Sequence, residues 1–97
     1  MLHHYVFLKY TKDTPPSHID EFCTRMQALC NTVPGIEQLL IGRDMLHEAR
    51  SWDLILDMRF ASLETLTHYR QHPAHQAVMA FNGPQVAEVG AVDFLLP

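Results

Sequence analysis

The chain has 97 residues, of which 47% are hydrophobic, and its formal net charge is -4. The length fits one domain, residues 1–97, and the hydrophobic content is too high for a disordered chain. Lys and Arg are spread without a basic run, which argues against a nucleic-acid partner because phosphate contacts need clustered cations. No apolar run approaches membrane-spanning length and no signal-peptide pattern opens the chain, so we expect no membrane partner.

Residues 3–10 are rich in aromatic and β-branched types and predict a first strand. A helix follows, with Thr14 or Ser17 as its cap and Pro34-Gly35 as its end. Apolar side chains recur along it at spacings of three and four: Ile19, Phe22, Cys23, Met26, Leu29, Cys30 and Val33. This spacing predicts an amphipathic helix with one face in the core.

Two cysteines, Cys23 and Cys30, lie seven residues apart on this helix. Two helical turns separate them by about 10.5 Å, which exceeds the roughly 7 Å limit for a disulfide. We therefore expect reduced cysteines and a cytoplasmic protein.

The second half of the chain alternates strands and helices. A strand is predicted at 36–41, a polar loop at 43–51 and a further strand at 52–60. The next helix is capped by Ser62 and broken at His72-Pro73, and a short helix follows at 73–81. The last strand is predicted at 86–96, and Gly90 marks a bulge or bend in it. The order of the main elements predicts an α+β, ferredoxin-like βαββαβ fold with a four-stranded antiparallel sheet.

In this fold the helices cover one face of the sheet and leave the other bare. An exposed apolar sheet face is typical of an interface, so we expect a homodimer whose sheets face each other and close into a dimeric α/β barrel. Asp57 and Arg59 share a strand face and are positioned to pair across that dimer.

The segment from Tyr69 to His75 holds a phenol and two imidazoles on either side of Pro73. Tyr and His both donate and accept protons, and His does so near neutral pH. If the fold brings this segment to His4 in the first strand, the result is an acid/base site that needs no cofactor. His72 and His75 could share a metal, but no third ligand is evident, so we expect no metal and a capping role for His72.

Several segments match one known family in order and spacing. They are HYVFLKY at 4–10, VPGI at 33–36, GRD at 42–44, FASLE at 60–64, YRQHPAH at 69–75 and VDF at 92–94. The chain resembles the stress-responsive A/B barrel family, also called Dabb, whose members are dimeric α+β barrels. Most bacterial members have no established activity.

One branch of this family consists of plant polyketide cyclases, which fold a linear polyketide thioester by aldol condensation without a cofactor. The resemblance implies that His4, Tyr69 and His75 occupy the positions of the working residues. It also implies apolar pocket positions at Val6, Leu8, Phe22, Cys23, Met26 and Leu56. Cys23 and Met26 stand where the plant enzymes have larger aromatics.

We expect the protein to bind a small apolar molecule, aromatic or polyketide-like, and to act on it as a cyclase or isomerase. His75 would be the general base, Tyr69 would hold a carbonyl oxygen, and His4 would be a second acid/base group. The structural alternative is that His75 caps backbone around Pro73, and that Tyr69 and His4 are satisfied core residues. Two functional alternatives stay open: a non-enzymatic stress-response dimer without a ligand, and a cofactor-free monooxygenase.

Overall fold

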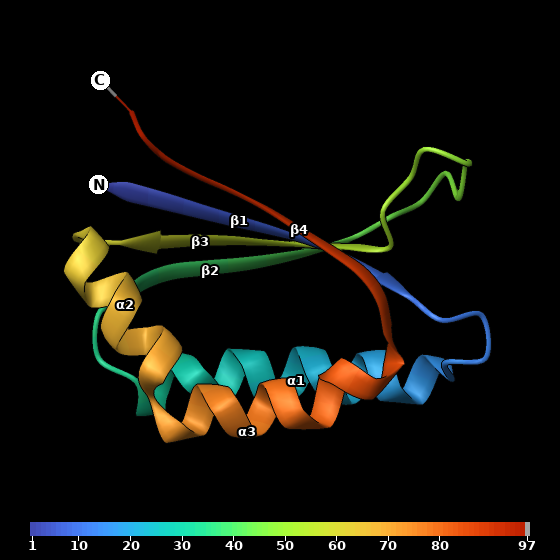
Figure 1. Cartoon of the computed structure of the whole chain (residues 1–97), viewed down its shortest axis with the longest axis horizontal. Helices are drawn as coiled ribbons and strands as arrows, with labels where there is room; N and C mark the ends of the chain where they lie inside the picture. The colour runs from blue at the N-terminus through green and yellow to red at the C-terminus, as the bar shows by residue number, and fades with distance from the viewer. Residues whose placement is uncertain (97) are drawn as a thin grey trace.

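The computed structural model describes residues 1–96. The elements in chain order are β1 (Leu2–Tyr10), α1 (Pro16–Thr32), β2 (Ile36–Arg43), β3 (Leu54–Phe60), α2 (Leu63–Gln71), α3 (Pro73–Asn82), a 3-10 turn η1 (Gly83–Gln85) and β4 (Val86–Leu95). The strands form one antiparallel sheet in the order β2-β3-β1-β4, and the helices lie on one face of it (Figure 1). This confirms the predicted ferredoxin-like fold.

Strand β1 lies at the centre of the sheet, between β3 and β4. His4 is opposite Met58 on β3 and opposite Asp93 on β4. Because side chains alternate along a strand, His4 and Leu8 face the helices, whereas His3 faces the open side. The register therefore decides which histidine of the His3-His4 pair can reach the helices.

The core fills the space between the sheet and the helices. Its largest fully buried side chains are Phe22, Met26, Leu54, Met58, Phe60 and Leu66. They come from α1, β3 and α2, so the apolar face of α1 packs on the sheet as its spacing predicted.

The first turn of α1 differs from the prediction, since neither Thr14 nor Ser17 caps it. Pro15 occupies the N-cap position and makes no side-chain cap. The Thr14 hydroxyl instead donates to Gln85 Oε1 at 3.0 Å. The missing cap costs little here, because Pro16 at the first helical position has no N–H to satisfy.

Gly90 was predicted to mark a bulge or a bend, and the bulge is wrong. The pairing of β1 with β4 is regular at Gly90 and shifts between Lys9 and Tyr10. A Cβ at Gly90 would lie 3.3 Å from the Trp52 ring, which also contacts Phe7 at a centroid distance of 5.9 Å. The glycine thus gives Trp52 room to lie across the open face.

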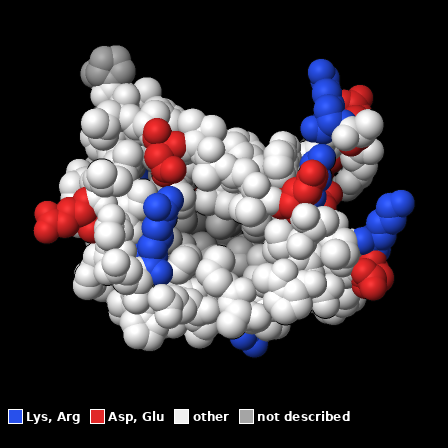
Figure 2. Space-filling model, in the orientation of Figure 1, with Lys and Arg blue, Asp and Glu red and all other residues white. Residues whose placement is uncertain are grey.

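The surface seen in Figure 2 has few charged side chains near its centre. Lys, Arg, Asp and Glu gather toward the two ends, and the middle is hollowed between the sheet and the helices. No helix within residues 1–96 has the length and apolar character needed to cross a bilayer.

Two glycines offer a matched stability test. Gly35 has φ +95, and a Cβ there would lie 3.2 Å from Thr65 Cβ; Gly83 has φ -53 and open space around it. We expect Gly35→Ala to lower the free energy of unfolding by about 1–2 kcal/mol, because an L-residue is strained at positive φ. Gly83→Ala should raise it by about 0.4–1 kcal/mol. Urea unfolding at one fixed protein concentration measures the free energy of unfolding of both variants. Equal effects of the same sign would contradict the backbone conformations given for the two glycines.

Candidate acid/base site

The break between α2 and α3 positions the central residues of the site. His72 is extended, with φ -69 and ψ 134, and serves as the C-cap of α2 and the N-cap of α3. Its Nδ1 accepts a hydrogen bond from the Ala74 N–H at 3.0 Å, so the predicted capping role of His72 is confirmed. Pro73 has no N–H and forces the preceding residue out of helical geometry.

The break also leaves a backbone carbonyl free. In a continuous helix the Ala74 N–H would donate to the Arg70 carbonyl, but here it donates to His72. The Arg70 oxygen accepts from His75 Nδ1 at 3.2 Å instead. The same geometry brings the Tyr69 and His75 rings to a centroid distance of 4.4 Å.

This hydrogen bond fixes the tautomer of His75. A carbonyl oxygen only accepts, so Nδ1 carries the hydrogen and Nε2 holds the lone pair in the neutral ring. Burial lowers the pKa of His75, and the bond to the Arg70 carbonyl opposes that shift only in part. His75 is therefore a neutral imidazole near pH 7, with Nε2 available as a base.

Tyr69 is 2% exposed and packs against Phe60 at a ring distance of 5.2 Å. Burial raises the pKa of Tyr69, so its hydroxyl stays protonated. No residue among 1–96 makes a hydrogen bond to that hydroxyl, although its ring lines a cavity. A buried phenol without a partner is ready to donate to a ligand oxygen.

His4 approaches the same cavity from β1. Its Nδ1–H donates to the Asp93 carboxylate on β4 in a very short contact, and Arg70 Nη2 lies 3.8 Å from the other oxygen of Asp93. Nε2 is then the nitrogen of His4 left for a ligand. Asp93 had no predicted role, although its place on β4, directly opposite His4, puts both side chains on the helix-facing side.

These three residues line one partly open cavity of about 80 Å³. It lies between the sheet and the helices, on the side opposite the bare face. The lining residues are His4, Val6, Leu8, Phe22, Leu56, Tyr69, His75, Met79, Asn82 and Val89. Met79, Asn82 and Val89 were not predicted, because the sequence alone did not place α3 and β4 beside each other.

Four of the six predicted apolar pocket residues line this cavity, and Cys23 and Met26 do not. Met26 is completely buried in the core. The Cys23 sulfur is 3.6 Å from Arg43 Nη2, which also donates to Asp20 at 2.7 Å. The rotation of α1 thus directs Phe22 toward the cavity and Cys23 toward the side of the helix near β2.

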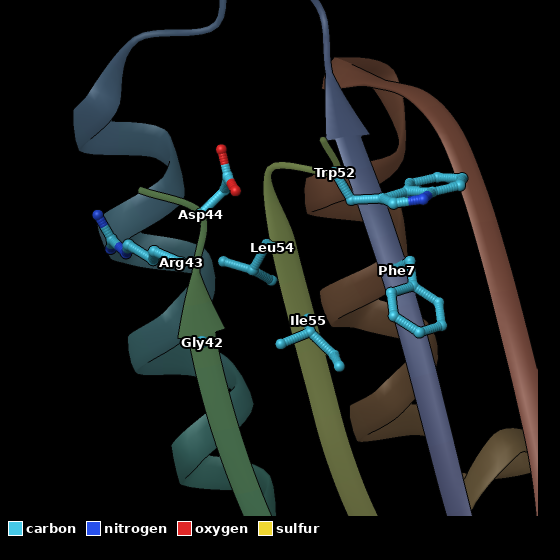
Figure 3. Close-up of a pocket in the computed structure, with 7 residues that line it drawn as sticks. All are labelled: Phe7, Gly42, Arg43, Asp44, Trp52, Leu54 and Ile55. Carbon is cyan, nitrogen blue, oxygen red and sulfur yellow. The ribbon is translucent and has the colours of Figure 1, made fainter. Parts of the chain in front are cut away.

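A larger groove of about 320 Å³ lies at one end of the sheet, over its open face. Figure 3 shows Trp52 and Phe7 beside β1, and Arg43 directed toward α1. The lining residues are Phe7, Gly42, Arg43, Asp44, Trp52, Leu54 and Ile55. This set lacks histidine and tyrosine, and its charged members are engaged: Arg43 with Asp20, and Asp44 with the His47 backbone at 2.6 Å. The groove is therefore a weaker candidate for proton transfer.

No group of three or more His, Cys, Asp or Glu side chains within residues 1–96 is arranged to hold a metal ion. His72 and His75 lie on different sides of the helix break, and each has a backbone partner at its Nδ1.

Known proteins match about three quarters or more of the chain. The chain is 27% identical over 74 residues to olivetolic acid cyclase from Cannabis sativa. The aligned part covers 74% of this chain and 73% of that protein. A dimeric ferredoxin-like protein of unknown function from Thermobifida fusca superposes with a TM-score of 0.87 at 22% identity, over 98% of this chain and 90% of that one. Hydroxynitrile lyase from Passiflora edulis superposes with a TM-score of 0.88 at 16% identity, over 99% and 93%.

The two structural matches are below 25% identity and show the fold alone. The family is shown by the sequence model of the stress responsive A/B barrel domain, which matches residues 2–96. The chain therefore belongs to the stress-responsive A/B barrel (Dabb) family.

Proposed function

We propose that the cavity lined by His4, Tyr69 and His75 binds a small, largely apolar carbonyl compound, aromatic or polyketide-like, and that the protein catalyses a cofactor-independent proton transfer on it, such as a cyclisation or isomerisation. The observation that carries the proposal is that three proton-transfer groups line one apolar cavity. The ring centroids of Tyr69 and His75 are 4.4 Å apart, and His4 is hydrogen-bonded to Asp93. Apolar cavities with a few convergent polar groups are the usual form of small-molecule sites.

His75 is the general base. Its Nε2 lone pair removes a proton from the carbon next to the substrate carbonyl, and the Arg70 carbonyl stabilises the imidazolium that forms. Tyr69 donates its hydroxyl hydrogen to the carbonyl oxygen, where negative charge develops as the enolate forms. Its raised pKa keeps the hydrogen in place for this role.

His4 is the second acid/base group. Asp93 orients its ring through Nδ1, which directs Nε2 to the substrate. Such a group can return a proton to the second carbonyl of a cyclising chain. The relative named olivetolic acid cyclase supports a cyclisation, and the neighbour named hydroxynitrile lyase supports an enzyme on this fold.

The non-enzymatic alternative requires a tightly packed interior. Met26 fits that requirement, since it is completely buried. Phe22 and Leu56, however, line a cavity of about 80 Å³ that reaches both His4 and His75. A cavity with an unpartnered phenol favours ligand binding over pure packing.

We also propose that the protein is a homodimer joined through the open sheet face. Leu40 is 52% exposed on that face, and Asp57 Oδ1 and Arg59 Nε are buried in a single chain without a hydrogen-bond partner. Buried polar atoms normally have partners, so these two unpartnered atoms suggest that the open face is rearranged when it is covered. The structural neighbour from Thermobifida fusca is described as dimeric, which supports this arrangement.

We place the protein in the cytoplasm, where thiols stay reduced. Cys23 and Cys30 are both free and half-buried on α1. Burial raises the pKa of Cys30, which keeps its thiol protonated and unreactive.

Proton abstraction can be measured without knowing the natural substrate. We expect the protein to catalyse exchange of the α-hydrogens of 2-butanone with D₂O, followed by NMR. His75→Ala should slow this exchange by at least about 100-fold, and Tyr69→Phe should do the same, because each removes one partner of enolate formation. His47→Ala, in the exposed loop before β3, is the matched control and should exchange like the wild type. A wild-type rate no higher than that of His75→Ala would contradict the proposed chemistry.

Two substitutions that introduce a charge, one on the open sheet face and one on the helices, test the proposed dimer. We expect light scattering to give the wild type a mass twice the 11.1 kDa of one chain. Leu40→Glu should yield single chains, because it buries an unpaired charge at the interface. Leu63→Glu, at a 67% exposed leucine on α2, should leave the dimer intact. Single chains of the wild type at micromolar concentration would overturn this arrangement.

A further inference from the structure

Asn82, the last residue of α3, is a polar residue deep in the interior. It is 2% exposed and lines the same cavity as His75. Seven residues of helix separate Asn82 from His75, a rise of about 10.5 Å. The cavity therefore has polar groups at two places along α3, with apolar side chains between them.

Two hydrogen bonds to its oxygen fix the orientation of the Asn82 amide. Its Oδ1 accepts from the Tyr10 hydroxyl at 2.8 Å and from His18 Nε2–H at 3.0 Å. Two donors saturate a carbonyl oxygen, so Nδ2 with its two hydrogens is directed the other way. Neither N–H has a partner within residues 1–96.

The side chains behind Asn82 are themselves held. The His18 ring stacks on Phe81 at 4.5 Å and 15°, and the Arg25 guanidinium lies 3.9 Å from the Phe81 centroid. Tyr10 meets His18 edge to face at 5.8 Å. This packing keeps both donors on the oxygen and prevents the amide from turning over.

A second space adjoins the cavity at Asn82. It is an open groove of about 340 Å³ between the end of α3 and β4, lined by Leu8, Met79, Asn82, Gly83, Val86, Ala87, Glu88 and Val89. Leu8, Met79, Asn82 and Val89 line both spaces, so the two meet there. The flexible Met79 side chain and Val89 form an apolar passage between them.

The inner cavity is small for a whole ligand of the expected class. About 80 Å³ is roughly half the 150 Å³ of a cavity known to hold benzene. A longer molecule with its reacting carbonyl beside His75 has to extend through the passage into the outer groove. The unpartnered N–H groups of Asn82 stand where its chain would pass.

We propose that Asn82 is a specificity-determining residue that binds a second oxygen of an elongated substrate. The reacting carbonyl lies among His4, Tyr69 and His75, the chain leaves between Met79 and Val89, and an oxo group on that chain accepts a hydrogen bond from Asn82 Nδ2. This inference rests on the proposed function and adds to it the residue that recognises a second oxygen of the substrate. A site built to hydrogen-bond a ligand oxygen discriminates against the analogue that lacks it.

The test compares ketones of one length. The probes are 2-nonanone, with one carbonyl, and nonane-2,4-dione, nonane-2,6-dione and nonane-2,8-dione, with two. We expect at least one dione to bind the wild type about tenfold or more tightly than 2-nonanone, and to shift the side-chain NH₂ signals of Asn82 in ¹H–¹⁵N spectra. Asn82→Asp keeps the shape but loses the donors, and it should abolish the preference. Asn31→Asp, an exposed asparagine on α1, is the matched control and should retain it.

Asn82 signals that stay in place with every probe, or equal affinity for 2-nonanone and the three diones, would overturn the inference. The wild-type spectra decide this even if Asn82→Asp does not fold. His75→Ala separates the two proposals, since it should stop 2-butanone exchange while the diones still shift the Asn82 signals. Loss of exchange with unmoved Asn82 signals would remove the role of Asn82 and leave the catalytic proposal standing.

Discussion

The site depends on one constraint, the break that Pro73 imposes between α2 and α3. A continuous helix would use the Arg70 carbonyl for the Ala74 N–H, whereas the break gives that N–H to His72 and the carbonyl to His75. One missing backbone donor thus turns the helix, brings Tyr69 and His75 into contact and selects the tautomer of His75. No metal or distant charge is needed to prepare the base.

Side chains alternate along each strand, so the sheet has one face toward the helices and one open face. His4 and Leu8 face the helices and help to line the cavity, while the neighbouring His3 stacks on Phe94 on the open face. A ligand site and a dimer interface can therefore share β1 without competing for the same residues. Residues of one chain line the cavity, and association would cover the other face of the sheet.

Much of this could be predicted from the sequence, because local signals were strong. Alternation, helical periodicity and the His72-Pro73 pair predicted the order of the elements, and the family motifs pointed to His4, Tyr69 and His75. The partners Asp93 and Asn82 could not be predicted in the same way. Their contacts with His4 and Tyr10 span 89 and 72 residues, and they depend on the register of β4 and on where α3 ends. Cys23 and Met26 do not line the cavity, because a stripe of apolar residues does not fix the rotation of a helix to within one side chain.

The state of the His75 ring tests the central claim most directly. Long-range ¹H–¹⁵N NMR distinguishes a protonated ring nitrogen from one with a lone pair and follows both through a pH titration. The structure predicts a hydrogen on Nδ1 and a lone pair on Nε2 at pH 7, with a midpoint below the ordinary histidine value of about 6.5, because burial disfavours the charged ring. A hydrogen on Nε2 in the neutral ring, or an imidazolium that persists above pH 7, would contradict the account.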